Sequence, residues 1–419
     1  MSLVKLIRWT QCLHEATVIK QVDVRLEKGR PVVTVDVRPA KHRQSRCSQC
    51  QRRCPGYDQG AGLRFWRGLD LGPVVVYLRG QAPRVSCPEH GVVVAETPWA
   101  REPKAWFTRA FDDHATWLVA RMAVSTVATY LRSTHRAINA AVARVTQELA
   151  GKVDRLDGLL RIGIDEVSFR KGQRYILRVV DHDTGRQVWA GEGANSDTLR
   201  KFFDALGPER AKQLRRVSAD GAEWIHTVVA ERAPQAKLCL DPYHVVAWAT
   251  KAVDEVRRRV VAELKAAGRY EQAASLKGSR WALLKNMPDL TGAQKTTLAS
   301  IQRDNKTLYR AYLLKEQLRK VFSVSNPSQA KSLLAGWLAW AKRSRIPEFT
   351  KVATTVEKMR DLIWNTLSSG GLSNAIVEAT NNHFRLLTRR AYGYHNAETL
   401  IAMSELMLGG LCPPLPGRA

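Results

Sequence analysis

Alternating apolar and polar residues at the N-terminal end of the chain predict a β-rich region. Residues 21–38 alternate around the segment Lys28 to Pro31 and are typical of a β-hairpin. Residues 71–85 form a second run of this kind, which predicts another hairpin. From Phe107 to Leu149 apolar residues recur at helical spacing, with two short polar breaks. The first 150 residues are therefore expected to hold a β-rich module followed by three helices.

Residues 160–240 consist of short strand-like runs with helical runs between the later ones. A turn signal from Asp181 to Gly185 separates the second strand from the third, so the first three strands are expected to form an antiparallel meander. One helical run precedes the fourth strand and another precedes the fifth, which gives the order β-β-β-α-β-α-β. The five strand-like runs are 160–164, 174–180, 186–191, 214–219 and 236–240.

The remaining chain is predicted to be helical. From Val245 to about Thr366 it is rich in Ala, Leu, Lys and Arg at helical spacing, which predicts an all-helical domain. A break rich in Ser and Gly at 368–373 precedes a last helical stretch that begins at 374. The proline-rich end of the chain is expected to be a frayed tail.

Composition and charge narrow the class of protein. The 419 residues include 45% apolar residues and 12 Trp, enough for a large core, which excludes global disorder. The formal charge of +27 favours nucleic acid as the polyanionic partner. Residues 1–150 hold 23 basic and 12 acidic side chains and residues 245–361 hold 23 and 10, whereas residues 151–244 hold 16 and 14. Acids kept beside a polyanion suggest metal-dependent chemistry on phosphates.

Cysteine content and hydropathy indicate the cellular compartment. Seven Cys in a chain of this length do not resemble the disulfide framework of a small secreted protein. No apolar run approaches the roughly 20 residues that span a bilayer, and the N-terminal end lacks a signal-peptide pattern. We therefore expect no membrane partner and a cytoplasmic protein.

Four potential metal ligands form two pairs, Cys47 with Cys50 and Cys87 with His90. Each pair has the two-residue spacing of a tight turn beside a hairpin, which suits tetrahedral Zn²⁺ in a zinc-ribbon-like module. Free thiols in an intracellular protein are the alternative interpretation. Cys54 is open to two roles, since it could replace His90 or remain unligated.

The helices between Phe107 and Val145 have the lengths of a helix-turn-helix. Ser125 is a candidate N-cap for the second helix, and Ser133 or Thr134 is expected to cap a recognition helix that begins near His135. Arg132, His135 and Arg136 would lie at its start and are candidate DNA contacts. In the basic helical segment, Arg257, Arg258 and Arg259 are further candidates. Five Trp of that region are expected to be mostly core residues, one of which could stack on a base: Trp248, Trp281, Trp337, Trp340 and Trp364.

Two carboxylates are expected to meet at the ends of adjacent strands. Asp165 ends the first strand of the mixed α/β segment, and Asp220 ends the fourth. A right-handed crossover places the fourth strand beside the first, so the two side chains lie about one strand spacing, ~4.8 Å, apart and could share metal ions. Asp241 also ends a strand, but that strand lies one place further out, which ranks Asp241 second for this role.

A third acid, Glu378, begins the last helical stretch. Polar residues follow it at helical spacing and could contact phosphate or water; they are Asn381, Asn382 and Arg385, and Arg389 and Arg390 extend the strip. The alternative interpretation is an exposed amphipathic helix.

Taken together, these motifs resemble those of the ISL-three family of bacterial insertion-sequence transposases. The resemblance covers nearly the whole chain, and its most specific parts are the strand Gly163 to Glu166 and the block from Val377 to Tyr394. Ala379 and Arg385 depart from the expected pattern, which has Gly and Lys there.

The resemblance implies a multidomain α+β protein with an RNase H-like catalytic domain interrupted by a helical insertion. It places the D, D, E triad on Asp165, Asp220 and Glu378, with Asp241 and His244 as accessory residues. The expected domains are a zinc-binding module at 1–104, a helix-turn-helix at 105–150, a catalytic domain at 151–244 and 367–410, an insertion at 245–366 and a tail at 411–419.

The resemblance also implies an activity. Such an enzyme binds the terminal inverted repeats of its element and cleaves and joins DNA strands with Mg²⁺ or Mn²⁺ at the triad and Zn²⁺ in the N-terminal module. Its partner is double-stranded DNA, from the repeats and the target, and we expect a homodimer or higher oligomer on that DNA. The resemblance also implies association with the bacterial nucleoid. The alternatives are a non-catalytic or domesticated DNA-binding regulator and an RNase H-like structure-specific nuclease.

Overall fold

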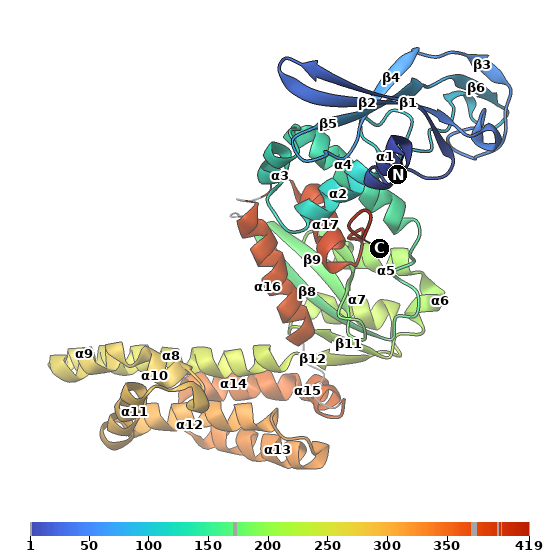
Figure 1. The fold of residues 1–419 in the computed structure, drawn as a ribbon. Helices are drawn as coiled ribbons and strands as arrows, with labels where there is room; N and C mark the ends of the chain where they lie inside the picture. The colour runs from blue at the N-terminus through green and yellow to red at the C-terminus, as the bar shows by residue number, and fades with distance from the viewer. Residues whose placement is uncertain (1, 171–173, 370–374, 392–393, 395, 419) are drawn as a thin grey trace. The chain divides into compact units, whose positions relative to one another are not determined.

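The computed structural model describes residues 2–170, 174–369, 375–391, 394 and 396–418 (Figure 1). The chain divides into two compact units, which are described separately. Unit 1 comprises residues 1–155 and 386–419, and unit 2 comprises residues 156–385. Among the described residues, no helix has both the length and the apolar composition needed to cross a membrane.

Unit 1 contains a four-stranded sheet with the strand order β1-β2-β5-β4. Its strands are β1 (Thr17–Glu27), β2 (Arg30–Pro39), β4 (Leu63–Arg67) and β5 (Val75–Gln81). The hairpin predicted at 21–38 is confirmed, because β1 pairs antiparallel with β2. Lys28 and Gly29 form its turn with φ values of 51° and 75°, the left-handed conformation that two-residue hairpin turns require.

The hairpin predicted at 71–85 is wrong. This region holds β5 and β6 (Arg84–Cys87), but the two strands belong to different sheets. β5 pairs with β2 and β4, whereas β6 pairs with β3 (Gly56–Asp58) and β7 (Gly91–Val94). Alternation along the chain identifies strands but not their partners, and these partners come from elsewhere in the module.

The larger sheet of unit 1 packs around two tryptophans. Trp66 and Trp99 are buried and meet edge to face, with ring centroids 5.2 Å apart. Ile7 from α1 (Leu3–Thr10) joins the same core. A short 3₁₀ turn, η1 (Lys41–Arg43), follows β2 and leads toward the first cysteine pair.

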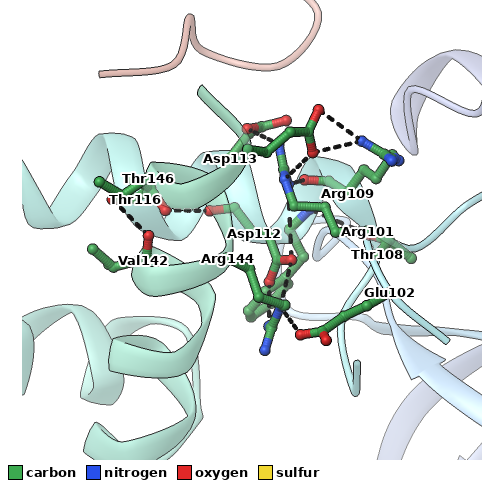
Figure 2. Close-up of polar contacts among 12 residues, drawn as sticks. Arg101, Glu102, Thr108, Arg109, Asp112, Asp113, Thr116, Val142, Arg144 and Thr146 are labelled. Atoms are coloured by element: carbon green, nitrogen blue, oxygen red, sulfur yellow. Dashed lines mark hydrogen bonds and ion pairs between the residues drawn. The ribbon is translucent and has the colours of Figure 1, made fainter. Parts of the chain in front are cut away.

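Three helices follow the sheets: α2 (Arg109–Val119), α3 (Val124–Tyr130) and α4 (His135–Ala150). Of the two N-caps predicted for α4, Thr134 is the one observed, since its hydroxyl accepts a hydrogen bond from the amide of Ala137. The N-cap predicted at Ser125 is wrong, because α3 begins at Val124 with Ala123 as its N-cap. α2 and α4 are joined by a buried ion pair between Asp112 and Arg144 (Figure 2). α17 (Ala397–Leu408) packs against α4 within the same unit.

Unit 2 contains the predicted five-stranded sheet, with the order β10-β9-β8-β11-β12. Its strands are β8 (Arg161–Arg170), β9 (Arg174–Asp181), β10 (Gln187–Glu192), β11 (Arg216–Ala219) and β12 (Lys237–Leu240). The predicted meander is confirmed by antiparallel β8–β9 and β9–β10 pairing, and β11 lies parallel to β8, as the crossover rule requires. Helices α5 (Ser196–Leu206), α6 (Pro208–Ala211) and α7 (Glu223–Arg232) connect the later strands.

The two faces of this sheet differ. Ile162 and Ile164 of β8 point into an apolar core that includes residues of α5 and α7. The alternate residues, Gly163 and Asp165, therefore face the other side. That side is covered by α16 (Ala375–Arg390), which runs along β8 and β9 in Figure 1.

Residues 242–367 are mainly helical, as predicted for the segment from Val245 to about Thr366. The helices are α8 (Pro242–Ala266), α9 (Tyr270–Gly278), α10 (Arg280–Leu284), α11 (Gly292–Asp304), α12 (Lys306–Val321), α13 (Pro327–Arg343), α14 (Pro347–Lys358) and α15 (Arg360–Leu367), with a 3₁₀ turn η2 (Met287–Asp289). α8 leaves directly from β12, and α15 returns to the same strand. The Asn365 amide and the Thr366 hydroxyl donate to the carbonyls of Leu238 and Leu240.

Two expectations about the C-terminal part need comment. The tail is not simply frayed, because Leu411 is buried and the Arg121 guanidinium contacts the Cys412 sulfur. Most of the predicted break at 368–373, and two residues of the block that ends at Tyr394, lie outside the described residues.

Candidate functional site

Three aspartates stand at the same level on three neighbouring strands of unit 2. In the parallel β8–β11 ladder Gly163 pairs with Ser218, so Asp165 and Asp220 both follow two residues later. In the β11–β12 ladder Ala219 pairs with Leu240, so Asp241 directly follows β12 as Asp220 follows β11. The predicted neighbourhood of Asp165 and Asp220, with Asp241 one strand further out, matches this register.

One detail of the prediction is wrong: Asp165 does not end its strand. β8 continues to Arg170, because it remains paired with β9 beyond the point where β11 stops. At Asp165, β8 is therefore hydrogen-bonded to β9 along one edge, whereas its other edge is no longer paired with β11. Pairing with β9 fixes the backbone at Asp165 more firmly than a free strand end would.

The acids in this region are crowded and partly buried. Burial raises the pKa of Asp165, and the nearby charge of Asp220 raises it further. Burial raises the pKa of Glu166 to about 7, with the charges of Asp220 and Asp165 adding to the effect. One carboxylate oxygen of Glu166, Oε2, is buried without a hydrogen-bond partner among the described residues. Carboxylate oxygens are the ligands that Mg²⁺ takes, but in the described part of unit 2 no three Asp, Glu, His or Cys side chains bring their ligand atoms together as a metal site.

α16 brings one of its predicted residues, Asn381, into contact with this region. The amide nitrogen Nδ2 of Asn381 donates to Oδ2 of Asp165 at 2.5 Å. Glu378 precedes Asn381 by three residues, about 4.5 Å along the helix axis. Its side chain is exposed, and no hydrogen bond or ion pair engages it within the described part of the chain.

The other predicted residues of α16 point away from the sheet. Asn382 and Arg385 are exposed and contact each other, with the Arg385 guanidinium donating to Oδ1 of Asn382 at 3.3 Å. Helix periodicity groups them with Glu378, but only Asn381 turns its side chain fully into the interface with β8.

Asp241 and His244 stand beside the acids on the first turn of α8. Asp241 is buried and accepts a hydrogen bond from the amide of Tyr243, as an N-cap does. His244 Nε2 lies 3.9 Å from Oδ2 of Asp241, and a positive charge on its imidazole would lower the pKa of Asp165 and of Glu166. The pair is therefore close to the site, as an accessory role requires.

Sequence reasoning missed two residues of the site. Glu166 is not among the predicted site residues. The available signal is its position directly after Asp165, since two consecutive acids inside an apolar strand are unusual. Arg178 of β9 is fully buried next to Asp165 and donates to Asn381. An arginine in the middle of the apolar run 174–180 was the available signal.

The four predicted zinc ligands lie together in unit 1, with all their ligand atoms within 4.8 Å of one another. The Cys50 and Cys87 sulfurs are 3.7 Å apart, and His90 Nδ1 lies 3.8 Å from the Cys47 sulfur and 3.6 Å from that of Cys87. Zn–S bonds of about 2.3 Å in a tetrahedron put sulfurs ~3.8 Å apart, so the donor set fits zinc.

Local structure explains why these ligands converge. Cys47 lies on a tight turn closed by a hydrogen bond from the Gln51 amide to its carbonyl, and the Gln49 amide donates to its sulfur. Cys87 ends β6 and His90 precedes β7, so the second pair lies on a hairpin turn. Cys54 is outside this group of four; it is buried, and its thiol contacts the Arg52 carbonyl.

The candidate DNA contacts near α4 differ in whether their side chains are already engaged by other residues of the protein. His135 and Arg136 are exposed at the start of the helix. Arg132 instead pairs with Asp70 at 2.6 Å and donates to the carbonyl of Pro73 at 2.8 Å. It therefore joins the turn before α4 to the N-terminal sheet.

Several of the other candidate arginines are also engaged. Arg257 is buried and pairs with Asp254, and Arg259 pairs with Glu348 at 2.8 Å. Arg258 is exposed and lies 3.3 Å from Asp254. At the end of α16, Arg389 is exposed, but Arg390 donates to the last carbonyls of α2, as a helix C-cap does.

The tryptophans of the helical segment are mostly core residues, as expected. Trp337 is fully buried and donates to the Leu314 carbonyl, and Trp248, Trp340 and Trp364 are partly buried against the same core. Trp281 is exposed.

Comparison with known proteins identifies the family. Residues 162–404 match a family model described as transposase of the ISL-three type, and residues 43–90 match one described as the zinc-finger of transposase IS204/IS1001/IS1096/IS1165. The chain belongs to the ISL-three transposase family. The matched ranges include the acids of unit 2 and the Cys₃His cluster.

Pairwise comparison with individual proteins also finds transposases. The chain is 44% identical over 440 aligned residues to the transposase for insertion sequence element IS1557 of Mycobacterium tuberculosis, covering 100% of this chain and 98% of the relative. It is 31% identical over 243 residues to the transposase for insertion sequence element IS1001 of Bordetella parapertussis, covering 57% of this chain and 58% of the relative.

Proposed function

We propose that this ISL-three transposase binds the terminal inverted repeats of its insertion sequence and catalyses metal-dependent DNA strand cleavage and strand transfer. The observation that carries the proposal is the parallel β8–β11 register, which puts Asp165 and Asp220 at the same level while Asn381 of α16 contacts Asp165. Family membership supplies the reaction class, and the register supports a site for it.

Asp165, Asp220 and Glu378 are the proposed catalytic acids. The strand order 3-2-1-4-5 with two parallel crossovers supports an RNase H-like domain. Bound Mg²⁺ or Mn²⁺ supplies Lewis-acid activation of the attacking oxygen and stabilises charge on the leaving 3′ oxygen. The protein's part is to hold the ions with the three carboxylates and to keep Asp165 oriented through Asn381.

α2, α3 and α4 are the proposed helix-turn-helix that reads the repeat. His135 and Arg136 are exposed at the start of α4, where a recognition helix contacts base edges and phosphates. Arg258 and Arg389 remain exposed for phosphate contacts, whereas Arg132 and Arg257 are proposed to act through the structure they hold. We expect a homodimer or higher oligomer on the DNA.

The test is a nicking assay on DNA that carries candidate terminal repeats, with and without Mg²⁺. Asp165→Asn, Asp220→Asn and Glu378→Gln are each expected to abolish nicking and strand transfer while repeat binding persists. Asp241→Ala is the comparison for the choice of second acid, and it is expected to reduce nicking less than Asp220→Asn does. Repeat binding by the wild type without metal-dependent nicking would favour a regulator, and nicking independent of the repeat would favour a structure-specific nuclease.

A further inference from the structure

Arg178 is a buried cation behind the acids of unit 2. It has no exposed surface, and it stands opposite Asp165 in the antiparallel β8–β9 ladder. Burial lowers its pKa to about 10, against the favourable charge of Asp165. A buried arginine is costly unless its donors are used, so its contacts should be specific.

Those contacts lead to α16 rather than directly to the acid. Nε of Arg178 donates to Oε1 of Gln187 at 2.7 Å, and Nη1 donates to Oδ1 of Asn381 at 2.6 Å. The guanidinium also lies over the Phe384 ring, 4.9 Å from its centroid. No ion pair joins Arg178 to Asp165 among the described residues, because Asn381 stands between them.

The contact with Arg178 decides which way the Asn381 amide points. Arginine can only donate hydrogen bonds, so the amide oxygen must face it, and the amide nitrogen must face the other way. The nitrogen then donates to Oδ2 of Asp165, while Oδ1 of Asp165 accepts from the backbone amide of Glu166 at 2.8 Å. Each oxygen of Asp165 thus keeps lone pairs for a cation.

We propose that Arg178 is a positioning residue for the catalytic acids, acting through Asn381. It fixes the orientation of the Asn381 amide so that its N–H group donates to Asp165. It also anchors the part of α16 that carries Glu378, which lies about one helical turn before Asn381. This inference rests on the proposed function, since it assigns the residue that orients the carboxylate proposed to hold the catalytic metal.

Lysine is a poor substitute at this position. Its ammonium is a point charge and lacks the planar fork that reaches Gln187 and Asn381 together. Arg178→Lys is therefore expected to keep the buried charge but release the amide. Groups that orient metal ligands typically change metal affinity about 10–100-fold when altered.

The experiment measures the Mg²⁺ concentration that gives half of the metal-induced rise in melting temperature, together with half-saturation of nicking. We expect Arg178→Lys and Asn381→Ala each to raise both about 10–100-fold. In the Asn381→Ala background, Arg178→Lys should add less than about threefold, because the two residues act in series.

Lys315→Met is the matched control for loss of a buried cation. Lys315 is also almost fully buried, in the helical insertion, where it donates to the carbonyls of Leu283 and Lys285. Its variant is expected to lose stability but to keep the wild-type half-saturation by Mg²⁺.

The outcomes separate the two proposals. A wild type that neither nicks DNA with Mg²⁺ nor gains stability from it contradicts the proposed function. A wild type that does both, while Arg178→Lys keeps its half-saturation or adds its full effect to Asn381→Ala, contradicts the positioning role alone. If Arg178→Lys does not fold, Asn381→Ala still decides whether the amide orients the acid, and a normal half-saturation in that variant overturns the proposal.

Discussion

Asp112 in unit 1 and Asp165 in unit 2 are both shielded from solvent, but the groups that surround the two carboxylates differ. In unit 1, Asp112 has no exposed surface and is contacted by Arg144 at 2.7 and 3.1 Å and by Arg101 at 3.7 Å (Figure 2). Arg101 also pairs with Asp113 and with Glu148. Acids and bases are matched within this network, which links α2, α4 and the preceding segment.

In unit 2, no arginine contacts Asp165 directly among the described residues, although Arg178 stands opposite it in the β8–β9 ladder. Burial and the charge of Asp220 raise the pKa of Asp165, and Arg178 contacts the Asn381 amide instead. Burying unmatched charge is unfavourable, so a fold that only needed stability would pair or remove these acids. The comparison indicates that the unit 1 network serves folding, whereas the acids around Asp165 are those expected from the proposed metal-dependent function. Four changes test it, ordered by their expected effect on the free energy of unfolding.

Loss of the zinc ligands is expected to have the largest effect. The double change Cys47→Ser with Cys50→Ser should abolish the binding of about one zinc per chain, an interaction worth ~10 kcal/mol or more in small zinc modules. Hydrogen exchange should then show loss of protection in β6 and β7, while Mg²⁺ still stabilises unit 2. Cys412→Ser is the control, and a folded wild type without zinc would contradict the assignment.

Arg144→Met should be next, because it leaves Asp112 buried with a weaker partner. The expected loss is about 3–5 kcal/mol at pH 7, measured by urea unfolding. Burial raises the pKa of Asp112 to about 6, against the opposing effect of Arg144. Removing Arg144 raises this pKa further.

The pH dependence follows from that direction. A carboxyl whose pKa is raised by folding stabilises the protein below its unfolded pKa, and this contribution is lost as pH rises through the folded value. The deficit of Arg144→Met should therefore shrink as pH falls from 7 toward 4. Arg109→Met removes an exposed arginine of the same network and should cost at most about 1 kcal/mol. Equal losses at both pH values would contradict the network's role.

Patterns local in sequence predicted much of this structure. The strand order of unit 2 followed from the run order and crossover handedness, because each step depends on neighbouring segments. The β5–β6 pairing failed because strand partners in the N-terminal module are set by packing around Trp66 and by the metal-binding turns, which alternation does not encode.

The site shows the same limit. Asp165 and Asp220 were predictable from where apolar runs stop, and Glu378 and Asn381 from helical spacing with the family resemblance. Arg178 was not, since its role depends on the orientation of one amide on a helix about 200 residues later in the chain. Its burial also depends on Gln187 and Phe384, which only the fold brings together.

Gly163→Ala should have an intermediate effect. A Cβ at this position would overlap Cγ2 of Val377 and lie 2.9 Å from Nε2 of His182, so α16 could not approach β8 as closely. Overpacking of this kind lowers the free energy of unfolding by about 1–3 kcal/mol. Displacement of α16 should also lower the nicking rate under conditions in which the variant is still folded.

Two variants sharpen this prediction. Adding Val377→Ala should restore part of the activity by making room for the new methyl group. Gly336→Ala, on α13, is the control, since nothing lies within 4 Å of its added Cβ. It should stabilise the protein by about 0.5–1 kcal/mol. Wild-type nicking by Gly163→Ala would show that the close approach is not needed.

Asp165→Asn should have the smallest effect, and of the opposite sign. Burial and Asp220 raise the pKa of Asp165, so at pH 7 the folded protein bears the cost of keeping it ionised. The neutral amide can still accept from Asn381 through its oxygen. Without Mg²⁺ the variant should be more stable than the wild type by about 0.5–2 kcal/mol, the usual size of such gains at functional sites. With Mg²⁺ the wild type should recover the difference, because only it gains binding free energy. A loss of stability as large as that of Arg144→Met would make Asp165 a structural residue like Asp112, and the distinction between the two units would fail.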